Sequence, residues 1–118
     1  MPANQITTNE SWWYYLGQTY YRYDVSHTLT KSQSSPSYYK FTWSGPYSQQ
    51  AWVELDLSTG KMRCYFYIKR YGDNVYIEAL SVWKPFTYYG QFGASFNEWE
   101  ILTNANEALV TVSIPCQV

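Results

Sequence analysis

The stretch that decides the fold covers residues 51–83 and reads AWVELDLSTG KMRCYFYIKR YGDNVYIEAL SVW. Apolar and polar residues alternate in three parts of it, residues 51–57, 61–70 and 74–83. A period of two is typical of a β-strand with one buried face. Two turn signals, Ser58-Thr59-Gly60 and Tyr71-Gly72-Asp73, separate the three runs. The stretch is therefore predicted to form a three-stranded antiparallel meander.

The two turns also predict which residues face each other. A first turn centred on Thr59-Gly60 gives the apolar pairs Leu57 with Met62, Leu55 with Cys64, Val53 with Phe66 and Ala51 with Ile68. On the opposite face it gives the pairs Asp56 with Arg63, Glu54 with Tyr65 and Trp52 with Tyr67. A second turn centred on Gly72-Asp73 adds Ile68 with Ile77, Phe66 with Ala79, Tyr67 with Glu78 and Tyr65 with Leu80. Both turns give the same two faces, and a one-residue slip would mix them.

The second face of this meander is unusually aromatic for a surface exposed to solvent. It carries apolar and aromatic side chains among its charges, namely Trp52, Tyr65, Tyr67, Leu80 and Val82. Thr, Lys and Glu would be enough for solubility, so we expect something to cover this face or to bind it. The candidates are residues 12–16, residues 84–97, another subunit and a ligand.

Composition restricts the class of protein. The chain has 118 residues, which is the length of one domain. Charged residues make up only 14% and aromatic residues 21%, with 14 tyrosines. Tyrosine has an apolar body and a polar tip, so it suits half-wet surfaces. The net charge is −1 and no basic run occurs, which argues against nucleic acid and anionic membranes as partners.

Localisation and cysteine chemistry are left open by the sequence. No stretch reaches the roughly 20 apolar residues of a membrane span. Residues 1–5 lack the basic and apolar regions of a signal peptide, so the protein is expected to be cytoplasmic or a mature secreted form. Cys64 and Cys116 are both expected to face the core. Either a disulfide joins them or both remain buried thiols.

Further strands are predicted outside the meander. Residues 18–31 and 38–43 look extended, and residues 98–103 and 108–115 are expected to pair as a last hairpin. Residues 84–97 have no clear period and are expected to form a long loop. About seven strands with mostly short links predict one all-β domain over residues 1–118: a single antiparallel meandering sheet closed as a small barrel or folded as a β-sandwich.

The N-terminal segment has two interpretations. Thr7 and Glu10 have the spacing of a capping box, which favours a short N-terminal helix over residues 12–16. Its aromatic residues favour a strand starting at Trp12 instead. The helix is the first choice, because Gly17 follows the segment and can end a helix.

A candidate ligand site combines the aromatic sheet face with the loop over residues 84–97. Aromatic rings offer flat apolar platforms for the C–H faces of a sugar, and carboxylates accept hydrogen bonds from its hydroxyls. The sheet face supplies both groups, and the loop adds tyrosines beside glycines, a combination that suits adaptable recognition. The predicted site residues are Trp52, Glu54, Tyr65, Tyr67, Glu78, Tyr88 and Tyr89.

We find no catalytic, metal-binding or cofactor signature. Glu54 with Asp56, and Glu98 with Glu100, have i, i+2 spacing, which is more typical of an exposed strand face than of an acid–base pair. The single histidine, His27, has no Cys or His near it in sequence and is expected on the surface or in a turn. The glycines fit no nucleotide-binding loop.

The sequence therefore predicts a non-enzymatic binding module, with carbohydrate as the favoured ligand. One alternative is a small barrel that binds, cyclises or isomerises a hydrophobic small molecule in a cavity. The lining of that cavity would be Val53, Leu55, Phe66, Ile68, Ile77 and Ala79. A second alternative is an assembly protein that uses the aromatic face as the interface of a homo-oligomer.

Overall fold

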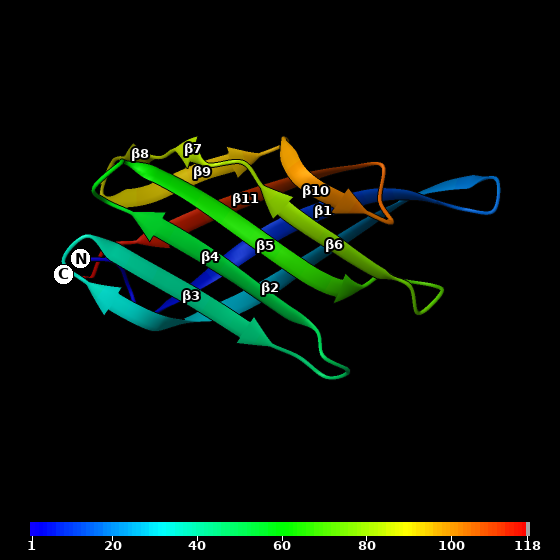
Figure 1. The fold of residues 1–118 in the computed structure, drawn as a ribbon, viewed down its shortest axis with the longest axis horizontal. Helices are drawn as coiled ribbons and strands as arrows, with labels where there is room; N and C mark the ends of the chain where they lie inside the picture. The colour runs from blue at the N-terminus through cyan, green and yellow to red at the C-terminus, as the bar shows by residue number, and fades with distance from the viewer. Residues whose placement is uncertain (118) are drawn as a thin grey trace.

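A computed structural model describes residues 1–117 and contains eleven β-strands in one antiparallel sheet (Figure 1). No helix occurs among these residues, so the predicted all-β class is confirmed. The strands are β1 (Gln5–Leu16), β2 (Thr19–Ser35), β3 (Tyr38–Ser44), β4 (Gln50–Asp56), β5 (Lys61–Lys69), β6 (Tyr76–Ser81), β7 (Lys84–Pro85), β8 (Thr87–Tyr88), β9 (Gln91–Phe96), β10 (Trp99–Thr103) and β11 (Glu107–Pro115).

The sheet curls into a half-barrel around a single core. Ten strands follow the order β10-β6-β5-β4-β3-β2-β1-β11-β9-β8, and β7 pairs with β5. In Figure 1, β3 to β6 lie in front of β1, β2 and β11, so the curled sheet forms two layers. The inward side chains of both layers form one hydrophobic cluster. Each layer therefore has an outer face that points away from the other layer.

The predicted meander is confirmed as β4, β5 and β6. Its second hairpin has the predicted register, with Tyr67 opposite Glu78 and Tyr65 opposite Leu80. The residues of β4, β5 and β6 also lie on their predicted faces, because buried and less buried positions alternate along β5 and β6. Trp83, the last residue of the third predicted run, is the exception: its ring lies 4.6 Å from Cζ of Arg63, which points outward.

The predicted register of the first hairpin is wrong by two residues. Trp52 lies opposite Tyr65 rather than Tyr67, and Glu54 lies opposite Arg63. Four residues, 57–60, connect β4 to β5, where two had been expected. Gly60 adopts a φ of 70°, which lets this longer turn close. A shift by an even number of residues moves each partner along the strand and keeps each residue on its face.

The predicted N-terminal helix is wrong, because residues 5–16 form strand β1. This strand pairs with β11 on one side and with β2 on the other, so both of its edges are hydrogen-bonded. Gly17 does not end a helix. It has a φ of 61° in the two-residue turn between Leu16 and Thr19. Pairing on both edges stabilises the strand more than the capping-box pattern of Thr7 and Glu10 would stabilise a helix. In the strand, the side chain of Trp12 points into the core.

Two predictions about the C-terminal third are also wrong. Residues 84–97 are not a long loop, because they contain β7, β8 and β9. Strands β10 and β11 do not form a hairpin: β10 pairs with β6, whereas β11 pairs with β1 and β9. The ring centroid of Trp99, on β10, lies 5.7 Å from that of Trp12, and its Nε1 donates to the carbonyl of Ala108 at 3.2 Å. This end of the chain thus crosses from one layer to the other.

The two cysteines are not joined. Cys64 is buried in the core, and Cys116 is half-buried against it. Burial raises the pKa of the Cys64 thiol far above its usual value, so this group stays protonated at physiological pH. The sequence left open a disulfide or two free thiols, and the structure has two free thiols. No helix within residues 1–117 is long and apolar enough to span a membrane.

Candidate functional site

Five of the seven predicted site residues lie together on the outer face of β4, β5 and β6. We call this surface the Trp52 face and define it by Lys40, Trp52, Glu54, Arg63, Tyr65, Tyr67, Tyr76 and Glu78. Strand alternation places these side chains opposite the buried positions of the same strands. The register brings Trp52, Tyr65 and Leu80 into one cross-strand row.

Aromatic rings on the Trp52 face form two stacked pairs. The rings of Trp52 and Tyr65 have centroids 5.4 Å apart and planes 19° apart. The rings of Tyr67 and Tyr76 have centroids 4.8 Å apart and planes 22° apart. All four side chains are half-buried. The result is an aromatic strip that crosses three strands and keeps part of its surface in water.

Charged groups of the same face cover part of this strip. Lys40 Nζ lies 5.0 Å from the centroid of the Trp52 ring, and Arg63 Cζ lies 5.4 Å from it. Arg63 also pairs with Glu54, with an Nη2 to Oε1 distance of 3.2 Å. Cation–π contacts of this kind stabilise exposed rings by about 0.5–1 kcal/mol each. The expected cover of Trp52 thus comes partly from its own neighbours.

Polar contacts hold Tyr65 and Glu78 in place. The Tyr65 hydroxyl donates to Glu78 Oε2 at 2.7 Å. Within residues 1–117, no hydrogen bond reaches Glu78 Oε1. Burial and then this hydrogen bond to Glu78 raise the pKa of Tyr65 from 10.0 to about 12. The neighbouring Tyr38 also has its pKa raised to about 12, first by burial and then by Glu54.

A tyrosinate titration tests this geometry. Because the folded-state pKa of Tyr65 is raised, its contribution to stability is present below pH 10 and is lost as pH rises towards about 12. We expect Tyr38 and Tyr65 to ionise last among the folded protein's tyrosines when ultraviolet absorbance is followed. Tyr65→Phe should remove one of the two late ionisations. An unchanged late phase in this variant would contradict the Tyr65–Glu78 contact.

No contact within residues 1–117 places Tyr88 or Tyr89 on the Trp52 face. The Tyr88 ring packs 4.9 Å from Phe92, in the β8–β9 hairpin. In the sheet order, β8 is the last strand at one end, whereas β6 is next to the last strand at the other end. Tyr89 is 89% exposed, the highest fraction among the large hydrophobic side chains of residues 1–117. These two tyrosines therefore form a separate exposed tip.

The interior proposed as a lined cavity is packed with side chains. Its six residues are all almost completely buried, with exposed fractions of 0–1%. None of the four surface pockets described for residues 1–117 is lined by any of them. These six residues are Val53, Leu55, Phe66, Ile68, Ile77 and Ala79.

His27 is not a surface histidine, contrary to the prediction. It lies on the inner side of β2, and its side chain is only 9% exposed. His27 Nδ1 is 2.7 Å from Oε2 of Glu10, whose side chain is fully buried. Thr8 Oγ1 donates to the same oxygen at 2.7 Å, and Trp12 Nε1 donates to Glu10 Oε1 at 3.3 Å. Each carboxylate oxygen therefore has a donor.

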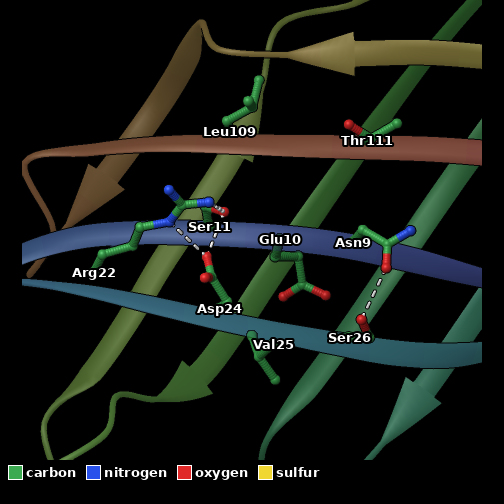
Figure 2. Close-up of a pocket in the computed structure, with 9 residues that line it drawn as sticks. All are labelled: Asn9, Glu10, Ser11, Arg22, Asp24, Val25, Ser26, Leu109 and Thr111. Carbon is green, nitrogen blue, oxygen red and sulfur yellow. Dashed lines mark hydrogen bonds and ion pairs between the residues drawn. The ribbon is translucent and has the colours of Figure 1, made fainter.

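A second outer face, on β11, β1 and β2, holds a surface pocket of about 390 Å³ (Figure 2). We call this surface the Trp13 face. It is defined by Asn9, Ser11, Trp13, Tyr15, Tyr20, Arg22, Asp24, Ser26, Glu107, Leu109 and Thr111. The sequence did not indicate this face, because a helix over residues 12–16 would not place these side chains in rows on one sheet. The two-residue turn at Gly17-Gln18 would have been the signal, since it pairs Ser11 with Asp24 and Trp13 with Arg22.

Comparisons with known proteins return no relative for this chain. No protein-family model, no curated protein and no solved structure matches it. Within residues 1–117, no group of three or more His, Cys, Asp or Glu side chains is arranged to hold a metal ion.

Proposed function

We propose that this protein is a non-enzymatic binding module and that carbohydrate is the ligand of the Trp52 face. The observation that supports this proposal best is the aromatic strip of Trp52, Tyr65, Tyr67 and Tyr76. Flat rings of this kind match the C–H faces of a pyranose. The four residues lie on neighbouring strands of a hydrogen-bonded sheet. Little backbone conformational entropy is therefore lost when a ligand binds.

Polar groups at the border of the strip supply the directional contacts that a sugar needs. Glu78 is oriented by Tyr65 and keeps Oε1 available for a sugar hydroxyl. Lys40 Nζ makes a cation–π contact and no ion pair within residues 1–117, so its N–H groups can donate to a ligand. Tyr88 and Tyr89 contribute only if an extended ligand reaches the tip formed by β8 and β9.

A glycan array tests the proposal with Trp52→Ala and Glu78→Gln. We expect the wild-type protein to bind a subset of glycans. Each variant should lose at least about tenfold in affinity, because Trp52→Ala removes a stacking ring and Glu78→Gln weakens a hydrogen bond to a charged group. Tyr89→Ala is the control for a short glycan, because its side chain lies at the exposed tip. Thermal unfolding confirms that each variant is folded.

Two results would contradict the proposal. One is the absence of wild-type binding to any glycan. The other is unchanged binding in both Trp52→Ala and Glu78→Gln. A concentration-dependent dimer that Trp52→Ala dissociates, without any glycan binding, would assign the face to assembly instead.

A further inference from the structure

The Trp13 face lies on the other layer of the half-barrel and presents its side chains in regular cross-strand rows. The register of β11, β1 and β2 aligns Thr111, Asn9 and Ser26 in one row. The next row holds Leu109, Ser11 and Asp24, and the one after it holds Glu107, Trp13 and Arg22. Tyr15 and Tyr20 follow at the end of the hairpin. Small polar residues thus lie beside a group of aromatic residues.

The small side chains make room for a ligand. Asn9, Ser11, Ser26 and Thr111 leave a depression between larger neighbours, and Figure 2 shows Arg22 and Leu109 at its border. Its volume of about 390 Å³ falls in the range of about 300–1,000 Å³ that is typical of small-ligand sites.

Hydrogen bonds within the depression orient its polar groups. Asp24 Oδ1 accepts from Ser11 Oγ at 2.6 Å and from Arg22 Nε at 2.9 Å, as Figure 2 shows. Ser26 Oγ donates to Asn9 Oδ1 at 2.9 Å. The hydrogen bond from Ser11 and then that from Arg22 lower the pKa of Asp24, so this carboxylate is ionised at neutral pH.

The same contacts leave other polar atoms available to a ligand. Within residues 1–117, no hydrogen bond uses Asp24 Oδ2, Asn9 Nδ2 or Arg22 Nη1. The side chains of Asp24 and Arg22 are 62% and 59% exposed. The depression therefore offers one charged acceptor and two kinds of donor, an arrangement that suits vicinal hydroxyl groups.

Aromatic rings lie beside the depression, along the hairpin. Arg22 Cζ lies 5.3 Å from the centroid of the Trp13 ring, and the rings of Tyr15 and Tyr20 have centroids 4.6 Å apart. Tyr20 donates its hydroxyl hydrogen to Glu107 Oε1 at 2.9 Å. Stacking surface next to oriented donors and acceptors is the combination that polyhydroxylated ligands require.

We propose that the Trp13 face is a second ligand site, which binds a neutral glycan with one sugar ring in the depression and its neighbour along Trp13. The acidic and basic residues of this face are Arg22, Asp24 and Glu107, so its formal charge is negative and disfavours acidic glycans. A second copy of the chain fits less well, because the centre of a protein interface is depleted of charged residues. The inference does not depend on the Trp52 face.

The test is a glycan array, with neutral and acidic glycans as probes, of the wild-type protein, Asp24→Asn, Trp52→Ala and the double variant. We expect Trp52→Ala to keep binding neutral glycans. Adding Asp24→Asn to Trp52→Ala should lower the affinity for them at least about tenfold, because a hydrogen bond to a charged group is weakened. Asp24→Asn preserves the shape of an exposed side chain, so it should fold. Trp13→Ala should reduce binding of the same glycans.

The four proteins separate the two sites. If every bound glycan is lost in Trp52→Ala and none is affected by Asp24→Asn, the Trp52 face is supported and the second site is contradicted. Glycans lost in Asp24→Asn but unaffected by Trp52→Ala support the second site alone. Equal binding by Trp52→Ala and the double variant, or binding of acidic glycans only, would overturn the inference. So would a dimer that Asp24→Asn dissociates while glycan binding is unchanged.

Discussion

Replacing His27 by alanine is expected to lower the free energy of unfolding by about 1–3 kcal/mol, because the change removes a hydrogen-bond partner of a buried carboxyl group. Glu10 has a fully buried side chain, and His27 Nδ1 lies 2.7 Å from its Oε2. In the variant, only the hydrogen bonds from Thr8 and Trp12 to this carboxyl group remain. Urea unfolding followed by tryptophan fluorescence gives the difference directly.

Two control variants separate loss of the buried pair from loss of packing. Glu10→Gln with His27→Ala removes the carboxyl group together with its partner, so we expect the double variant to recover part of the lost stability. Asp24→Asn changes an exposed ion pair and should cost no more than about 1 kcal/mol. A His27→Ala variant within about 0.5 kcal/mol of the wild type would contradict the buried contact between Glu10 and His27.

Replacing Phe66 by alanine is expected to cost about 3–5 kcal/mol of unfolding free energy, the range found for large-to-small changes of aromatic core residues. Phe66 is fully buried. Its ring lies 5.4 Å from Trp12 in an edge-on geometry and 6.4 Å from Trp99. These contacts join β5 to β1 and β10, so the change opens a cavity at the junction of the two layers.

The matched control for Phe66 is Tyr89→Ala, an aromatic side chain that is 89% exposed. It should change stability by no more than about 0.5 kcal/mol. A double-mutant cycle of Phe66→Ala with Trp99→Ala should give a coupling energy of about 0.5–1.5 kcal/mol. A Phe66→Ala cost below about 2 kcal/mol would mean that the two layers do not pack around this ring.

Strand faces could be predicted because their signal is local. A period of two assigns each residue of β4, β5 and β6 to one side of the sheet, whichever strand lies beside it. The position of Trp52, Tyr65, Tyr67, Glu54 and Glu78 on one outer face therefore follows from the alternation alone. The register error between β4 and β5 left this result intact because it was an even number of residues.

Pairing partners could not be predicted in the same way. Thr7 and Glu10 satisfy a helix-capping pattern, and only pairing with both β2 and β11 makes the strand more stable. Strand β10 pairs with β6 rather than β11, and its Trp99 packs half-buried against the core beside Trp12. These contacts join residues far apart in sequence, so their energy does not appear in any local pattern.

The sequence by itself determined the all-β class, the meander and the two-sided nature of its strands, because side-chain alternation is fixed by the geometry of the extended backbone. The tertiary structure alone decided that Glu10 and His27 meet inside the half-barrel and that Ser11, Arg22 and Asp24 meet outside it. Both groups require β1 and β2 to pair in one register. That register is selected by the Gly17 turn and by the burial of Trp12, and burial depends on the whole curled sheet.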